Sequence, residues 1–212
     1  MGISRSISRR MAHGMALLLP LVVGGGCLSG SPPVHYFLLT PMASSATPST
    51  PAAAKAGVDQ PLIVVDPVEI PPYLNRSQMV TRSSENHLQL AQYEQWGDTL
   101  RENISRVVLE NLSTLLGTNR LSFPTAQIQE RPALRIVSQI SAFERGADGR
   151  IVLKVRWRLL DGQAGNVLIV QQSQFTSEPV EATDFDGMAA GMSGLLLEWS
   201  REMAREMRGY LH

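Results

Sequence analysis

The chain has 212 residues, of which 43% are hydrophobic and 18% are charged, with 19 basic and 19 acidic residues. This length and composition are typical of one globular domain with short accessory segments, and they exclude a disordered chain. Three of the basic residues lie in the first 26 positions, so the remainder carries 16 basic against 19 acidic residues and a net charge of −3. Nucleic-acid binders show a clustered positive surplus. We therefore expect no nucleic-acid partner.

Residues 1–26 have the order of a secretory signal peptide. The basic segment MGISRSISRR precedes the apolar MALLLPLVV, and small residues follow in GGG. The apolar stretch is shorter than the about 20 residues that a permanent membrane-spanning helix needs. The arginine pair at 9–10 is reminiscent of a twin-arginine signal, but the residues after it match poorly. We expect this segment to be removed on export.

Cys27 is the only cysteine, and it stands directly after the small residues. Its surroundings resemble a bacterial lipobox, with Gly24 at the place where Leu is usual. We predict lipidation of Cys27, with residues 27–33 as a tether; each buried CH₂ of an acyl chain would contribute about 0.8 kcal/mol to membrane binding. The alternative is cleavage by the general signal peptidase, which leaves Cys27 lost or inert. Leu28, rather than Asp, favours sorting to the outer membrane.

The next segment is predicted to consist of strands and turns. HYFLLT (35–40) and PLIVVDPVEI (61–70) have strand composition, and the proline within the second indicates an edge position or a bulge. Between them, residues 41–60 are rich in Pro, Ala, Ser and Thr, and we predict a flexible insertion. SQMVTR and HLQLAQY alternate around SSEN, which predicts a β-hairpin over 77–93.

A helix is predicted after the hairpin. Thr99 and Glu102 have the spacing of a capping box, with Asp98 as a competing cap, and Gly117 is suited to end the helix. One apolar stripe follows the helical period, formed by Leu100, Ile104, Val107, Val108, Leu112 and Leu115.

Three strands are predicted next, at 133–143, 150–160 and 166–175. In the second, Ile151, Leu153, Val155, Trp157 and Leu159 face one way, and Lys154, Arg156 and Arg158 face the other. This alternation is typical of an antiparallel sheet with one buried face.

The last element is predicted to be a second long helix, with Thr183 and Asp186 as candidate caps. Its methionines are either core filler or an adaptable lipid groove. Gly187, Gly191 and Gly194 would let it approach the sheet. Its apolar stripe comprises Met188, Met192, Leu195, Leu196, Trp199, Met203 and Met207. The elements together predict a single α+β domain over 34–212, an antiparallel sheet with two long helices packed on one face.

Several runs in a fixed order resemble one known family. They are VDPVEIPPYLNRSQMVTR (65–82), NHLQLAQYEQWGDTLRENISRVVLENL (86–112) and VLKVRWRLLDGQAGNVL (152–168), together with the terminal helix. They resemble the PqiC/YmbA family, the auxiliary lipoproteins of ABC-type intermembrane transport systems. The likeness covers most of the chain from His35 onward, although the insertion at 41–60 is longer than the family would lead one to expect.

The resemblance implies a non-catalytic role. Such proteins are outer-membrane-anchored, periplasmic subunits that work with mammalian-cell-entry (MCE) tunnel proteins and inner-membrane transport components. They contribute to lipid transport between membranes and to envelope integrity, and the resemblance implies a homo-oligomeric ring of copies. The alternative function is a structural or assembly lipoprotein of an outer-membrane complex, without a transported lipid.

The turn after the second strand is one candidate partner-binding site. Tyr73, Leu74 and Arg76 lie where loops present side chains, and we consider them a docking surface for a partner or a second copy. The alternative is structural: Pro71 and Pro72 fix the turn, Tyr73 packs its ring and Arg76 pairs with a local carboxylate.

The charged face of the predicted strand 150–160 is the other candidate. Lys154, Arg156 and Arg158, with Arg135, would face anionic lipid headgroups or an acidic partner; the alternative is a solvated sheet face. Trp96 is interpreted as a core residue that joins the hairpin to the helix.

No motif supports an enzyme, although a soluble periplasmic hydrolase with dispersed catalytic groups remains a third alternative. Beyond residue 26, the histidines are His35, His87 and His212, in unrelated contexts, and no HExxH, GxSxG or phosphate-loop pattern occurs. DGQAGN lacks the ligand spacing of a calcium loop. We therefore predict no enzyme activity, no cofactor and no metal.

Overall fold

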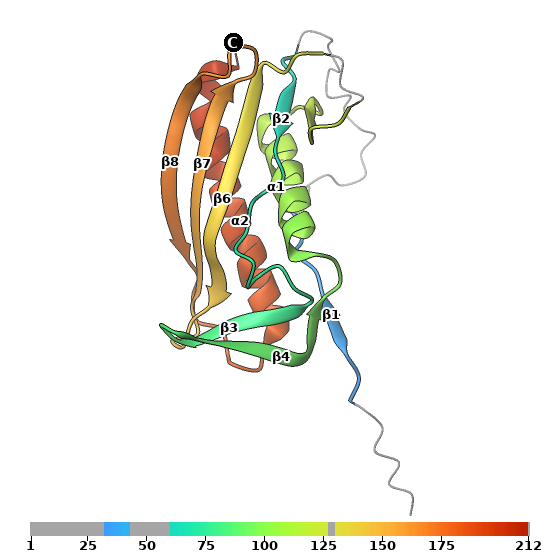
Figure 1. The fold of residues 1–212 in the computed structure, drawn as a ribbon, viewed down its shortest axis with the longest axis vertical. Coiled ribbons are helices and arrows are strands. Elements are labelled where there is room, and N and C mark those ends of the chain that lie inside the picture. Colours follow the sequence, from blue (N-terminus) through green and yellow to red (C-terminus); the bar gives the residue numbers. More distant parts are fainter. Residues whose placement is uncertain (1–31, 43–59, 127–129, 212) are drawn as a thin grey trace, which may run out of the picture. The chain divides into compact units, whose positions relative to one another are not determined.

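The computed structural model describes residues 32–42, 60–126 and 130–211. Residues 32–212 form one compact unit, shown as a ribbon in Figure 1. The predicted signal peptide, Cys27 and most of the predicted insertion at 41–60 lie outside the described residues.

The elements follow the predicted order of strands and helices (Figure 1). The strands are β1 His35–Phe37, β2 Ile63–Val65, β3 Gln78–Ser84, β4 His87–Trp96, β5 Leu121–Ser122, β6 Leu134–Arg145, β7 Ile151–Asp161 and β8 Val167–Thr176. The helices are α1 Leu100–Leu116, α2 Phe185–Met207 and a short 3₁₀ helix η1 Arg208–Tyr210. The two-residue strand β5 was not predicted, because two residues are too few to show a period.

The sheet is mixed, so the prediction of an antiparallel sheet is only partly right. The hairpin β3–β4 and the series β6–β7–β8 are antiparallel, as their alternation indicated. In contrast, β1 pairs with β4, and β2 pairs with β5 and β6, in parallel. A parallel pair needs a crossover connection, and the path from β2 to β6 passes through the β3–β4 hairpin and α1. Local patterns reveal hairpins but not partners that lie so far apart in the chain.

Strand β6 is the common neighbour of the two halves of the sheet. One of its edges is covered by β7 from Leu134 to Arg145. The other edge meets β2, then an isolated bridge from Glu69 to Gln139, then β3 at Thr81. The chain from β2 to β3 therefore runs alongside β6.

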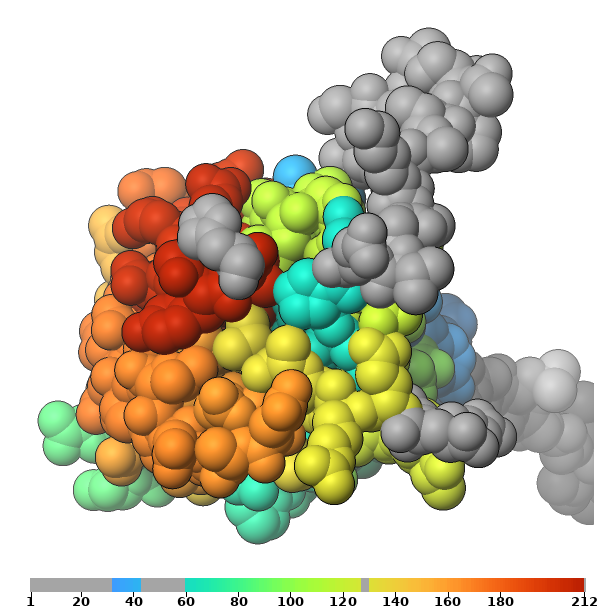
Figure 2. Space-filling model, turned by 90° about the horizontal axis from the view of Figure 1, so that it is seen from above, coloured from blue at the N-terminus to red at the C-terminus, as the bar shows by residue number. Residues whose placement is uncertain are grey.

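The two helices differ in how they meet the sheet. α2 packs against β7 and β8, and α1 packs along α2. Figure 2, seen from the end at which α2 terminates, shows the red helix directly beside the orange and yellow strands. The side chains of the predicted α2 stripe are all buried, so its methionines are core residues in this structure. Trp157, Trp199 and Phe143 are the largest of the fully buried side chains, and Trp96, 5% exposed, is buried as predicted.

The helix caps follow the sequence at α1 and differ at α2. The Thr99 hydroxyl accepts a hydrogen bond from the Glu102 N–H, and Gly117 ends the helix at φ 66°. At α2 the cap is Asp184, whose carboxylate accepts from the Gly187 N–H at 2.7 Å, and not Thr183 or Asp186. Of the three α2 glycines, Gly191 faces the sheet: a Cβ there would lie 2.6 Å from the Ile151 Cδ1.

Candidate interaction surface

The turn after β2 is held by its own backbone. The Leu74 N–H donates to the Pro71 carbonyl at 3.0 Å, and the Asn75 N–H donates to the Pro72 carbonyl at 3.2 Å. Leu74 is only 1% exposed and belongs to the hydrophobic core, so its side chain is not presented to a partner. Arg76 is exposed. This turn therefore offers less of a docking surface than its sequence indicated.

Tyr73 lies in a polar cluster with Arg82 and Glu144. The Tyr73 hydroxyl donates to Glu144 Oε2 at 3.0 Å, and the Arg82 Nε donates to Glu144 Oε1 at 2.8 Å. The Arg82 guanidinium also lies over the Tyr73 ring, 5.8 Å from its centroid. Glu144 is 4% exposed. A buried carboxylate is costly unless it is paired and hydrogen-bonded, and this cluster supplies both kinds of contact while joining the turn to β3 and β6.

Burial and the adjacent Glu144 carboxylate raise the pKa of Tyr73 to about 12. The phenol is therefore a stable hydrogen-bond donor throughout the neutral range, where an exposed tyrosine would also be protonated. The cluster has a structural role, because each of its three side chains is hydrogen-bonded within the fold and together they connect the turn to β3 and β6.

The next residue of β6, Arg145, connects this strand to the start of α2 and to the residues just before it. Its guanidinium donates to the carbonyls of Glu181 and Ala182 at 2.7 and 2.6 Å, and it lies 5.4 Å from the centroid of the Phe185 ring. Arg145 is 6% exposed, and this burial lowers its pKa from the usual arginine value. No local pattern predicts this contact, because its partners lie more than 30 residues further along the chain.

Lys154, Arg156 and Arg158 form an exposed row on β7, which we call the cationic stripe. Within the described ranges, none of the three forms an ion pair with an acidic side chain. Arg135 differs, because its guanidinium is paired with Asp66 at 2.9 Å. A hollow of about 280 Å³ borders Arg156 and Arg158 and also includes the exposed Glu69 and Gln139. The stripe is thus an exposed row of cationic side chains on the sheet face.

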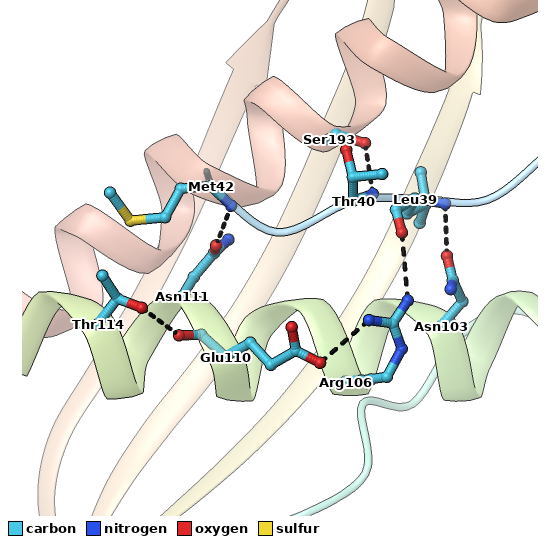
Figure 3. A network of polar contacts seen from close by, with 9 residues as sticks. All are labelled: Leu39, Thr40, Met42, Asn103, Arg106, Glu110, Asn111, Thr114 and Ser193. Atoms are coloured by element: carbon cyan, nitrogen blue, oxygen red, sulfur yellow. Dashed lines mark hydrogen bonds and ion pairs between the residues drawn. The ribbon is translucent and has the colours of Figure 1, made fainter. Parts of the chain in front are cut away.

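A second feature was not predicted from the sequence. Residues 39–42, just after β1, lie between the two helices without joining a strand (Figure 3). Side chains of the helices satisfy their backbone. The Leu39 N–H donates to Asn103 Oδ1 at 2.7 Å, and the Met42 N–H donates to Asn111 Oδ1 at 2.7 Å. The Thr40 N–H donates to the Ser193 hydroxyl of α2 at 3.1 Å.

These bonds explain two asparagines that interrupt the apolar face of α1. Asn103 and Asn111 are 1% and 0% exposed, and buried polar side chains require partners. We call Asn103, Asn111 and Ser193 the segment clamp. The clamp fixes the chain that follows β1, at the amino-terminal end of the described unit.

In the described portion of the chain, no helix is long and apolar enough to cross a membrane. In the same residues, no group of three or more His, Cys, Asp or Glu side chains is arranged to hold a metal ion.

The comparison with protein families decides the class of this molecule. The family model described as "ABC-type transport auxiliary lipoprotein component" matches residues 38–204. The chain belongs to this family. Its members are auxiliary lipoproteins of ABC-type transport, which confirms the family resemblance seen in the sequence.

Two curated proteins are similar to the chain along most of their length. The chain is 29% identical over 181 residues to the intermembrane transport lipoprotein PqiC of Escherichia coli K12, covering 84% of this chain and 87% of that protein. The PqiC protein of Shigella flexneri gives the same values.

Solved structures share the family fold. A crystal structure of an uncharacterized protein superposes with a TM-score of 0.65 at 18% identity, covering 83% of this chain and 99% of the other. A Xanthomonas campestris protein gives a TM-score of 0.57 at 15% identity, covering 82% and 90%. At these identities the likeness concerns the fold alone.

Replacement of Tyr73 by Phe tests the polar cluster of this family member. The folded pKa of Tyr73, about 12, exceeds that of an unfolded tyrosine, about 10. The phenol therefore stabilises the fold fully below about pH 10, and this contribution is lost as the pH rises toward 12. We expect Tyr73→Phe to lower the free energy of unfolding by about 1.5 kcal/mol near neutral pH, because a hydrogen bond to a carboxylate is removed.

Urea unfolding and tyrosinate absorbance measure these effects. When the absorbance of tyrosinate is followed as the pH is raised, the wild-type protein should show a component that titrates near pH 12. Tyr73→Phe should lack this component, and the control Tyr210→Phe, at an exposed tyrosine, should retain it. A late component that persists in Tyr73→Phe would contradict the role of the cluster.

Replacement of Asn111 by Ala tests the segment clamp. Loss of the acceptor for the Met42 N–H should accelerate hydrogen exchange at that amide by about 2- to 10-fold, the range expected for one hydrogen bond. Thr114→Ala is the control, because its hydroxyl bonds only to the Glu110 carbonyl of the same helix (Figure 3). An unchanged Met42 exchange rate in Asn111→Ala would show that the clamp does not hold the segment.

Proposed function

We propose that this protein is an outer-membrane-anchored periplasmic lipoprotein that serves as a non-catalytic auxiliary subunit of an MCE-type intermembrane lipid-transport system. The match of residues 38–204 to the transport auxiliary lipoprotein family carries the proposal. The name of its relatives, intermembrane transport lipoprotein, supports transport between membranes as the process.

The amino-terminal sequence supports the anchor. Cys27 follows a basic segment, an apolar segment and small residues, in the order of an exported lipoprotein. If lipid is attached to Cys27, the eight residue steps from Cys27 to His35 at the start of β1 span at most about 29 Å, at 3.3–3.6 Å per residue. The folded unit would then stay close to the membrane surface that holds the anchor.

The arrangement of polar groups supports a binding role for the domain. The buried charges Glu144 and Arg145 are committed to contacts within the fold. The cationic stripe is instead exposed on a sheet face. In this proposal the anchor holds one end of a transport bridge, and the domain provides protein surface to an MCE tunnel protein and to further copies of itself.

Replacement of Cys27 by Ala tests the anchor. The variant should move from the membrane fraction to the soluble periplasmic fraction, because the thiol that would carry the acyl chains is removed. Leu28→Ala leaves the thiol in place and should remain membrane-bound. Equal membrane association of wild type and Cys27→Ala would contradict the anchor.

Capture of the wild-type protein from gently solubilised envelopes tests the transport role. We expect an MCE-domain protein to be retained together with phospholipid, and mass spectrometry identifies both. Retention of an outer-membrane complex without an MCE protein and without lipid would contradict the transport role in favour of the assembly alternative.

A further inference from the structure

Strand β8, Val167–Thr176, is an unprotected edge of the sheet. Among the described strands it pairs with β7 alone, and Figure 1 shows it at the outer side of the sheet. Its sequence VLIVQQSQFT contains no charge, no proline and no glycine. Natural edge strands are blunted by charged residues, proline or bulges because a bare edge pairs with other chains. The one register shift lies near its start, between Leu159 and Leu160 of the partner strand, so the rest of β8 is regular.

The backbone groups that face outward can be assigned from the ladder. The Ser177 N–H donates to the Ile151 carbonyl at 2.9 Å, so this pair is hydrogen-bonded. Hydrogen-bonded and non-hydrogen-bonded pairs alternate along an antiparallel ladder. Four residues of β8 therefore direct their N–H and C=O groups to the free edge, namely Val170, Gln172, Gln174 and Thr176. The side chains of the same four residues are exposed.

The cationic stripe lies in register with this open edge. Arg158 is opposite Val170, Arg156 is opposite Gln172, and Lys154 is opposite Gln174. These are the non-hydrogen-bonded pairs, in which side chains approach most closely. A strand added to β8 would lie about 10 Å from β7, two strand spacings away. At that separation the long arginine and lysine side chains reach acidic side chains on the added strand.

We propose that the free edge of β8 binds an extended, acidic segment of a partner protein by β-strand addition, with the cationic stripe selecting carboxylates at alternate positions. The backbone of the edge supplies affinity, and the side chains of the stripe supply specificity. The inference deepens the proposed function, on whose partner-binding role it rests, by naming the chemistry of the bound segment.

Charge complementarity favours an acidic partner over a second copy at this edge. The β8 strand of another copy contains no acidic residue, so it would leave the stripe unmatched. An acidic strand would instead place its carboxylates on the same face as Lys154, Arg156 and Arg158, because side chains at every second position share a face.

Peptide binding to the full-length mature lipoprotein in detergent tests the proposal. The probe is a peptide of alternating glutamate and valine, matched in length to β8, and the control peptide has lysine in place of glutamate. We expect the acidic peptide to bind and to slow hydrogen exchange at the amides of Val170, Gln172 and Gln174, because these N–H groups acquire acceptors. The lysine peptide should not bind.

Two variants separate the backbone contribution from the charge contribution. Gln172→Pro removes one outward N–H and is tolerated at an edge strand, whereas Arg156→Glu reverses one charge of the stripe. Each should weaken peptide binding by about tenfold or more. Arg201→Glu, which makes the same charge reversal on the exposed face of α2, should have no effect. Urea unfolding of each variant verifies that it is folded.

Several results would overturn the proposal. These are equal binding of the acidic and lysine peptides, self-association of the protein through β8, or binding of phosphatidylglycerol vesicles that depends on Arg156 but not on the Gln172 N–H. Peptide binding that is unaffected by either variant would do the same. If an MCE protein is captured while the acidic peptide fails to bind, this inference is wrong and the proposed function stands. If the peptide binds but no transport component is captured, the proposed function is the part that is wrong.

Discussion

Two neighbouring charges of opposite sign at the end of β6 hold the parts of this fold together. Glu144 receives Tyr73 from the turn and Arg82 from β3, while Arg145 donates to the carbonyls that lead into α2. Both side chains are buried, and neither is tolerable there without its partners. Because adjacent residues of a strand point to opposite faces, one short stretch of β6 organises contacts on both sides of the sheet.

Much of the secondary structure was predictable because it depends on patterns among residues that are close together in the sequence. The alternation in β7 and the capping pair at Thr99 are both read from a few neighbouring residues, and the structure agrees. What could not be predicted depends on distant partners. The parallel pairing of β2 with β6 and the burial of Leu74 have no local period. The segment clamp is of the same kind, since Asn103 on a helix face indicates a buried polar group but not the backbone that it binds.

For the same reason, one part of the candidate site was predicted correctly from the sequence and the other was not. The cationic stripe follows directly from strand alternation, and its residues are exposed as a group. The turn residues were chosen because loops present side chains, yet Tyr73 and Leu74 face the interior. The outer sheet face, by contrast, is exposed at the cationic stripe and along β8. The buried charges Glu144 and Arg145 are paired within the fold, whereas the cationic stripe is exposed on the sheet face.

The parallel pairing of β1 with β4 has a mechanical consequence. The chain ahead of His35 leads straight into β1, whose three residues are matched with Glu94, Gln95 and Trp96. A force applied there along the strand would load these pairs together, in shear, instead of peeling them apart one after another. A force transmitted beyond β1 would next act on residues 39–42, whose backbone is hydrogen-bonded to Asn103 and Asn111. The start of the folded unit is therefore arranged to resist a pulling force applied through the chain ahead of it.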